Sequence, residues 1–309
     1  MSRFLRLRPI ALLRLCGFAG VLLLLAAAGG ALAQDGRFDQ GLLWRLDPPD
    51  GGRASYLLGT MHIADPRVLD IPDAVSQALA ASDTAVFEVI DSAAEQQAVA
   101  AMMFYSDGRN LEEELGAELW QQTVAVARTY GLTSPLVRRY KPWGLLVLLS
   151  VPVEQMRAMM ASGVVLDTLL QEEATRAGKD LRGLETAAEQ IQVFDDLPEE
   201  DQIALLRSLV ESKEENDLAF ELMLRFYLER DLAGILSVSD ALEDSQEAAL
   251  VARFMERLKT RRDANMFARL QPMLADGGLF IAVGALHLTG EAGLLERFAG
   301  AGYTVTAIY

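Results

Sequence analysis

The two ends of the chain carry the same order of predicted elements, and this repeated order constrains the fold more than any other feature. Each end has a short apolar run, a Gly-x-x-His segment, a helix and a second apolar run. Near the N-terminus these parts are residues 55–59, 59–62, 72–81 and 84–89; near the C-terminus they are residues 279–283, 284–287, 290–299 and 303–308. Short apolar runs bounded by turn residues are typical of buried strands. Two such β-α-β units predict one sheet to which both ends of the chain contribute.

The middle of the chain, about residues 93–276, has the apolar periodicity of helices. The exception is residues 181–185, which follow a Gly-Lys helix end and are predicted to form another strand. The predicted helices are 111–130, 142–150, 152–160, 164–177, 186–194, 198–229, 231–237 and 246–275. The sequence therefore predicts an α/β fold, with a mixed central sheet formed by the N- and C-terminal β-α-β units and a large, mostly helical middle region.

Residues 1–33 have the pattern of a secretory signal peptide. Four arginines precede an apolar run that ends in Ala31-Leu32-Ala33, an A-x-A cleavage signal. The run is shorter than the roughly 20 residues that a membrane-spanning helix needs. We expect cleavage near Ala33, no stable membrane anchor afterwards, and a periplasmic or secreted protein. Residues 34–309 are then expected to form a single domain, with the helical region at about 93–276 as an insertion.

Cysteine content and charge exclude several classes of protein. Cys16 is the only cysteine, and it lies within the predicted signal peptide, so the mature chain can form neither a disulfide nor a thiolate zinc site. The formal net charge of −16 becomes about −20 when the four signal arginines are removed. A charge of this sign opposes binding to nucleic acid or to anionic lipid.

The side chains best placed for chemistry follow the predicted strands. His62 and His287 are the only histidines among the 309 residues, and each comes three residues after a glycine. Ligands of open α/β sheets gather beyond the carboxyl ends of the strands, so the two imidazoles are expected to face one crevice. Glu88 lies within an apolar strand, where an unpaired charge is costly unless a metal ion or a cationic partner accompanies it. Two histidines and a glutamate form one known type of metal site with an open position for water.

Plainer interpretations of the same residues stay open. A histidine at a strand end can be a hydrogen-bonded core residue. Glu88 can pair with a nearby arginine such as Arg262 or Arg139. Glu185, at the end of its own predicted strand, is a second candidate ligand or general base. The sequence has no His-Glu-x-x-His helix, no Gly-x-Ser-x-Gly elbow and no phosphate-binding loop.

At these residues the sequence resembles the TraB/GumN family, which includes the TIKI metalloproteases. The matching segments occur in the family's order along nearly the whole mature chain. They are residues 57–62, 86–88, 141–143, 184–186 with Gln190, 262–263 before Met266, and 283–288 with Gly290. Asp263 departs from the pattern, in which asparagine is expected after the arginine.

The resemblance implies a mixed-sheet α/β fold related to the erythromycin-esterase-like and ChaN-like proteins. For the TIKI members it implies manganese- or cobalt-dependent cleavage of peptide bonds by both histidines and the glutamate. Family membership does not by itself establish that a chain is a protease.

The function hypothesis is a periplasmic metal-dependent hydrolase that acts on a peptide or another small extracytoplasmic substrate. His62, Glu88 and His287 would bind a divalent ion (Mn, Co or Zn), which would acidify a water molecule for attack on a carbonyl. Glu185 would be a further ligand or the base, and Arg262 would hold a substrate carboxylate or stabilise an oxyanion. The alternatives are a non-catalytic peptide- or glycan-binding protein and an accessory factor in exopolysaccharide production.

Overall fold

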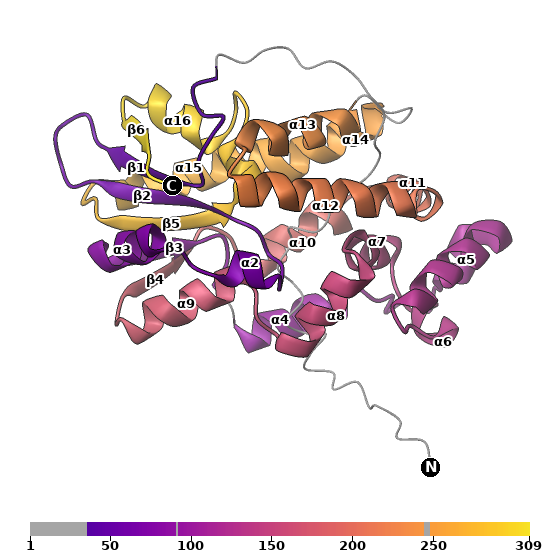
Figure 1. Cartoon of the computed structure of the whole chain (residues 1–309). Helices are drawn as coiled ribbons and strands as arrows, with labels where there is room; N and C mark the ends of the chain where they lie inside the picture. The colour runs from indigo at the N-terminus through magenta and orange to yellow at the C-terminus, as the bar shows by residue number, and fades with distance from the viewer. Residues whose placement is uncertain (1–35, 91, 244–247) are drawn as a thin grey trace.

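The structure is a computed structural model, and it describes residues 36–90, 92–243 and 248–309 (Figure 1). The predicted signal peptide lies outside the described residues. The single-domain organisation of residues 34–309 stays a prediction.

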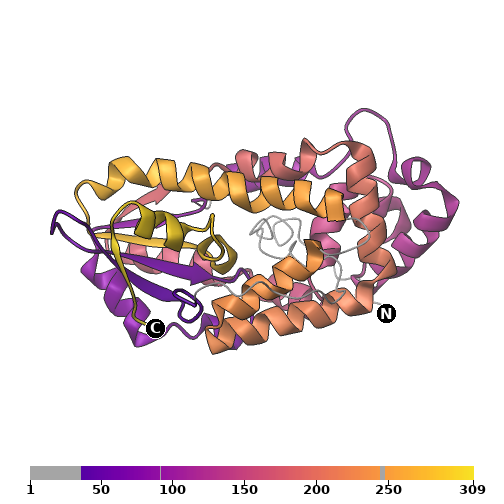
Figure 2. The same cartoon turned by 90° about the horizontal axis from the view of Figure 1, so that it is seen from above.

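A six-stranded mixed sheet forms one end of an elongated molecule (Figures 1 and 2). Its strands are β1 (Leu43–Asp47), β2 (Ser55–Thr60), β3 (Thr84–Phe87), β4 (Asp180–Gly183), β5 (Leu279–Gly284) and β6 (Thr304–Ala307), in the spatial order β4-β3-β5-β2-β1-β6. The four strands β2, β3, β4 and β5 run parallel, whereas β1 is antiparallel to both of its neighbours. Both ends of the chain contribute to the sheet, which confirms the predicted fold class.

Strand β5 lies at the centre of the parallel part, between β2 and β3. All six of its residues are buried. A strand covered on both faces has no solvent side, so its sequence is a continuous apolar run rather than an alternating one. Strand β4, which comes from the middle region of the chain, extends this parallel part beside β3.

The middle of the chain is helical, as the periodicity predicts. The helices before β5 are α2 (Pro66–Leu69), α3 (Asp73–Ala81), α4 (Ala93–Met102), α5 (Leu111–Thr129), α6 (Ser134–Val137), α7 (Pro142–Ser150), α8 (Val153–Ser162), α9 (Leu166–Arg176), α10 (Ala187–Asp195), α11 (Glu199–Glu211), α12 (Lys213–Glu229), α13 (Leu232–Glu243), α14 (Ala248–Met255) and α15 (Arg261–Leu274). The 3₁₀ turn η3 (Ala285–Leu288) and helix α16 (Leu294–Gly300) follow β5. Helices α5 and α6 lie at the end of the molecule farthest from the sheet (Figure 1).

Two of the predicted helices are broken in the structure. The predicted helix 198–229 divides at Ser212, whose backbone has φ −114° and ψ 36°. The predicted helix 246–275 contains a π-helical turn, η2 (Glu256–Thr260), between α14 and α15. Apolar periodicity cannot reveal either break, because a polar residue such as Ser212 suits the exposed face of a continuous helix equally well.

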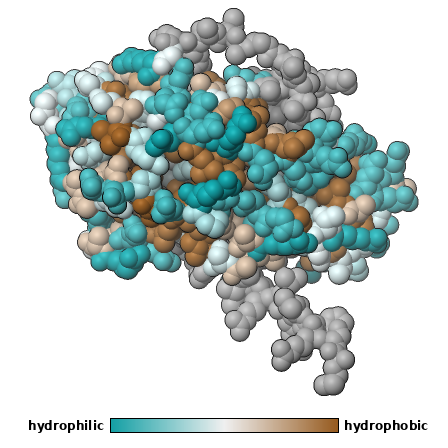
Figure 3. All heavy atoms as spheres, in the orientation of Figure 1, coloured by the Kyte–Doolittle hydropathy of each residue, from teal (hydrophilic) through white to brown (hydrophobic). Residues whose placement is uncertain are grey.

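Hydrophilic residues cover most of the face shown in Figure 3, and apolar residues gather along its middle. Within the described ranges, no single helix combines the length and the hydropathy of a membrane span. Only Pro142–Ser150 and Val153–Arg176 meet the criteria as a pair, and this pair is bent by 91°.

Candidate active site at the carboxyl ends of three strands

The three principal residues predicted from the sequence leave the sheet at one edge. His62 follows β2, Glu88 follows β3 and His287 follows β5. These strands are parallel neighbours, with Thr60 opposite Gly284 and Phe87 opposite Ala282. Their carboxyl ends therefore meet, which is where open sheets place their ligands.

The two histidine segments leave the sheet by different backbone paths. His62 lies two residues beyond the last β2–β5 pair, in non-helical chain, whereas His287 lies three residues beyond it, in the 3₁₀ turn η3. The chain turns at His62, where the N–H of Ile63 donates to the carbonyl of Met61 at 2.9 Å. Both rings nevertheless approach Gly284.

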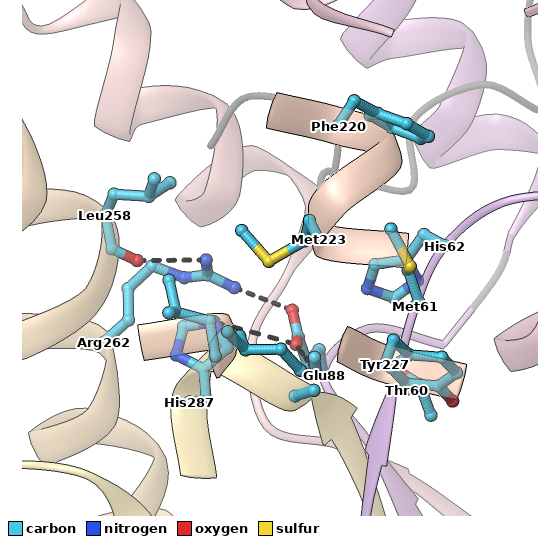
Figure 4. Close-up of a pocket in the computed structure, with 14 residues that line it drawn as sticks. Thr60, Met61, His62, Glu88, Phe220, Met223, Tyr227, Leu258, Arg262 and His287 are labelled. Atoms are coloured by element: carbon cyan, nitrogen blue, oxygen red, sulfur yellow. Dashed lines mark hydrogen bonds and ion pairs between the residues drawn. The ribbon is translucent and has the colours of Figure 1, made fainter. Parts of the chain in front are cut away.

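Gly284 lies between the three side chains. A methyl group added to its Cα would lie 3.2 Å from Oε1 of Glu88, 3.6 Å from Cδ2 of His287 and 4.0 Å from Nε2 of His62. The absence of a side chain at this glycine therefore leaves space in which the carboxylate and both rings converge. Figure 4 shows the Glu88 carboxylate between the two histidines.

Glu88 is buried and ionised. Its Oε1 accepts a hydrogen bond of 2.6 Å from the backbone N–H of Gly284 and lies 3.8 Å from Nε2 of His287. Its Oε2 accepts from Arg262 at 2.8 Å and from Gln190 at 3.0 Å. Burial acts to raise the pKa of this carboxyl, but the Arg262 guanidinium, the two imidazoles and the Gly284 N–H outweigh burial and lower the pKa to about 2.

Arg262 is the cation that compensates Glu88. Its guanidinium also bonds Glu185, from Nη2 to Oε2 at 2.7 Å and from Nε to both carboxylate oxygens, and Nη1 donates to the carbonyl of Leu258. Burial acts to lower the pKa of Arg262, and the two carboxylates raise it above its usual value. Arg139, the other partner considered from the sequence, is exposed and lies against the ring of Phe104. Glu88 is thus paired with an arginine, as one interpretation of the sequence proposed, and that arginine is Arg262.

His62 is paired with a residue that sequence analysis missed. Its Nδ1 lies 2.7 Å from Oδ2 of Asp167 on α9, and Oδ1 of the same carboxylate accepts from the Thr60 hydroxyl at 3.0 Å. The Nδ1–Oδ2 contact does not have hydrogen-bond geometry, so we describe it as an ion pair. Burial acts to lower the pKa of His62, but Asp167 and then Glu88 override burial and raise the pKa to about 9.

His287 also contacts a buried carboxylate, here through a hydrogen bond. Its Nδ1 lies 2.5 Å from Oδ1 of Asp263 on α15. The other oxygen of Asp263 accepts from the ammonium of Lys259 at 2.8 Å, and Lys259 also donates to the carbonyl of Thr289. Asp263 is fully buried. Since each ring uses Nδ1 to contact an aspartate, Nε2 is the ring nitrogen left for a ligand at both histidines.

The π-helical turn η2 leads directly into the first turn of α15, which supplies Arg262 and Asp263. Lys259, the fourth residue of η2, bonds the buried side chain of Asp263 on α15, while Arg262 reaches Glu88 and Glu185. A π-turn rotates the side chains that follow it relative to a regular helix, and such turns occur often at functional sites. Here the π-turn precedes α15, whose consecutive residues Arg262 and Asp263 have different partners. Arg262 bonds Glu88 and Glu185, and Asp263 bonds Lys259 and His287.

The site opens into a cavity of about 680 Å³, measured with its opening. The strand-end residues form one side of this cavity and apolar side chains from α12, α13 and η2 form another (Figure 4). The lining residues are Thr60, Met61, His62, Glu88, Phe220, Met223, Tyr227, Ile235, Leu258, Arg262, Gly284, Ala285, Leu286 and His287.

All five residues predicted as catalytic therefore belong to one connected cluster. Four of them line the cavity, and Glu185 lies behind Arg262. Analysis of the residues alone did not find Asp167 or Lys259. A signal existed for Asp167, because it lies on the apolar face of a helix beside Leu166 and Leu170, all three of them buried.

The donor chemistry at this point suits a divalent ion, with two free Nε2 atoms, each on a carboxylate-backed ring, and one carboxylate. The 3.8 Å between Nε2 of His287 and Oε1 of Glu88 is less than twice a ligand distance of about 2.1 Å. As the side chains stand, however, both oxygens of Glu88 are bonded within the protein. In the part of the chain that the structure describes, no group of three or more His, Cys, Asp and Glu side chains is arranged to hold a metal ion.

Comparison with protein families gives a match to the TraB/PrgY/gumN family over residues 42–307. The match begins just before β1 and ends at the last residue of β6, so it spans the whole sheet and the helices between its strands. Comparison with curated proteins and with solved structures gave no match.

Proposed function

The chain belongs to the TraB/PrgY/gumN family, and we propose that it is a metal-dependent hydrolase that acts on peptide bonds. His62, Glu88 and His287 would hold the divalent ion, through Nε2 of each ring and Oε1 of the carboxylate. When bound, the ion would polarise a carbonyl and acidify a water molecule.

The observation that carries the proposal is the charge balance of the buried cluster. Four buried carboxylates meet there: Glu88, Glu185, Asp167 and Asp263. Arg262 and Lys259 are the permanent cations bonded to them. With both imidazoles neutral, the cluster lacks two positive charges, and unpaired buried charge is costly. One divalent ion between the rings supplies the two missing positive charges, so its binding leaves the cluster without a net charge.

The remaining residues have supporting roles in this proposal. Asp167 and Asp263 orient the two rings and make the ligating nitrogens more basic. Arg262 keeps Glu88 ionised and its Oε2 fixed, which leaves Oε1 facing the rings. Glu185 receives the other donors of Arg262, so we assign it the task of holding the arginine in place rather than that of a ligand or base.

Metal titration with measured proton release tests the proposal. Calorimetry with Mn²⁺, Co²⁺ or Zn²⁺ near pH 7, repeated in two buffers of different ionisation enthalpy, should show one ion per chain and release of at least one proton. The proton comes from His62, whose pKa of about 9 keeps it protonated at that pH in the metal-free protein. Binding without proton release would exclude His62 as a ligand, and no binding of any of the three ions would overturn the proposal.

Hydrolysis is tested separately with a mixed set of internally quenched peptides and the metal-loaded protein. His62→Ala and His287→Ala should each abolish both stoichiometric metal binding and cleavage. Glu154→Gln is the matched control, since Glu154 is an exposed acid on α8 that pairs only with Arg157 in the described contacts. The site assignment is wrong if either histidine variant retains metal and activity.

A non-catalytic binding protein is the second candidate, and one observation favours it. Both oxygens of Glu88 are already hydrogen-bonded within the protein, by Gly284, Arg262 and Gln190, so this carboxylate has partners without a metal ion. In that case His62 and His287 would donate hydrogen bonds to a captured peptide or glycan. Ligand binding that weakens on His62→Ala, with no metal uptake and no turnover, would support this candidate over the hydrolase.

We also propose export of the protein with removal of residues 1–33. The support is the arginine-rich start, the apolar run and the Ala31-Leu32-Ala33 sequence. The mass of protein recovered from the extracytoplasmic fraction should correspond to a chain that begins at Gln34. A full-length chain in that fraction would contradict cleavage.

A further inference from the structure

The side of the cavity that faces the two histidines is apolar. Phe220, Met223 and Tyr227 project from successive turns of α12, Ile235 comes from α13 and Leu258 from η2. The spacing of the α12 residues is three and four, which places them on one face of the helix. In Figure 4 the side chain of Met223 is drawn between those of Arg262 and His62, and it lines the same cavity as Glu88.

The polar groups of these lining residues are already used within the protein. The Tyr227 hydroxyl donates to the carbonyl of Gly59 at 3.2 Å. Arg262 is the only arginine or lysine among the lining residues, and its donors bond Glu88, Glu185 and the Leu258 carbonyl. A ligand therefore meets ring nitrogens on one side and hydrocarbon on the other. A ligand carboxylate would find no unpaired cation in the lining, because Arg262 is bonded to two glutamates and a protonated His62 is paired with Asp167.

We propose that the cavity selects a neutral acyl compound: a peptide segment with a bulky apolar side chain beside the carbonyl that faces His62 and His287. The side chain packs against the α12 face, and the flanking peptide units are uncharged, so the site favours internal segments over free carboxyl termini. This inference takes its orientation from the proposed function, because the histidine side is assumed to receive the carbonyl.

Affinity for blocked amino acids tests the selection without requiring turnover. The probes are the N-acetyl amides of leucine, methionine, phenylalanine, alanine and aspartate, with N-acetyl-leucine as the free acid, titrated by NMR or calorimetry. The bulky apolar amides should bind at least about 10-fold more tightly than the alanine amide, since each methylene in an apolar pocket contributes about 10-fold or more. The aspartate amide and the free acid should bind more weakly still.

Variants on α12 localise the effect. Met223→Ala should reduce the leucine-over-alanine ratio by roughly 10-fold, because the cavity loses part of its apolar lining. Met223→Leu, which conserves volume, should retain most of the ratio even if Met223→Ala destabilises the fold. Leu218→Ala is the matched control, because Leu218 lies on the same helix but is 71% exposed and does not line the cavity.

The outcomes separate this inference from the proposed function. Apolar selectivity in binding, with neither metal uptake nor cleavage, supports the inference and overturns the hydrolase. Cleavage without preference for an apolar side chain overturns the inference and leaves the hydrolase intact. Equal binding of all probes, a preference for the aspartate amide or the free acid, or an equal effect of Leu218→Ala would each overturn the inference.

Discussion

The two Gly-x-x-His segments are alike in sequence and different in how the protein holds them. Both imidazoles present Nδ1 to a buried aspartate from a helix, Asp167 for His62 and Asp263 for His287. Asp167 is supported by a neutral donor, the Thr60 hydroxyl, whereas Asp263 is supported by the Lys259 ammonium. The shared motif therefore indicates that both histidines stand at strand ends. The charge around each histidine depends on residues outside the motif.

The two glycines also differ in purpose. A methyl group at Gly59 would meet Cα of Ala285 at 3.0 Å and Cβ of Ala285 at 3.1 Å, so this glycine permits the backbones after β2 and β5 to approach. A methyl group at Gly284 would instead meet the Glu88 carboxylate. The first glycine therefore serves packing, and the second keeps the site open.

The surroundings of the two histidines should differ most in the loss of stability when the aspartate beside each ring is replaced. Asp263→Ala leaves the Lys259 ammonium buried without its carboxylate, and we expect a loss of about 3–5 kcal/mol in the free energy of unfolding. Asp167→Ala leaves only a hydroxyl and a ring that can lose its proton, so we expect about 1–3 kcal/mol. Urea denaturation at pH 7 of the metal-free protein measures both.

The double variant Lys259→Met/Asp263→Leu is the control for the unpaired charge. It should recover part of the loss of Asp263→Ala, because no buried ammonium remains. Equal losses in the free energy of unfolding for Asp263→Ala and Asp167→Ala would show that Lys259 does not make the two histidine environments different.

The protonation of His62 should make stability depend on pH in the metal-free protein. Its pKa of about 9 when folded lies above the roughly 6.5 of an unfolded chain, so folding favours the protonated ring. This contribution is complete below about pH 6.5 and is lost as the pH rises to 9, a decrease of about 3 kcal/mol. Denaturation midpoints between pH 6 and 10 measure it. His62→Gln should flatten this part of the profile, and an unchanged slope in that variant would assign the effect to another group.

Substitution of the two glycines should separate packing from function. Gly59→Ala should cost about 1–3 kcal/mol, since the methyl group meets backbone that cannot easily move. Gly284→Ala has an allowed φ of −52° and meets a side chain, so we expect a smaller loss of stability but a loss of metal binding. Thermal denaturation and metal titration of both variants give the comparison. The reverse pattern would refute the division of roles.

The smallest effect is expected at Thr60. Thr60→Val removes the hydroxyl that donates to Asp167 and should cost about 1 kcal/mol. It should also weaken metal binding slightly, because the carboxylate that orients His62 is less firmly held. Thr289→Val is a matched control near His287, because the Thr289 hydroxyl bonds only the local carbonyl of Leu286. An identical change in metal affinity for both variants would contradict the role given to Thr60.

Much of the fold and part of the site could be predicted from local patterns. Apolar runs and turn residues place β2, β3, β4, β5 and β6 and most helices within a few residues of their observed bounds. The position of His62, Glu88 and His287 at strand ends follows from the same patterns, because the end of an apolar run is visible in the sequence. The breaks at Ser212 and in η2 could not be placed from the sequence, since neither changes the periodicity of the apolar face.

The sequence by itself determined that two histidines and a glutamate would stand at the carboxyl ends of buried strands. Only the tertiary structure decided what those groups contact. Asp167 lies 105 positions after His62, and Arg262 lies 174 positions after Glu88. Local propensity carries no information about which helix packs over which strand end, and the charge of a buried group is set by the neighbours that packing brings to it. The strand ends could be predicted, and Arg262 was one of two candidate partners of Glu88, whereas the choice of Arg262 over Arg139 and the different supports of the two histidines became visible only in the folded chain.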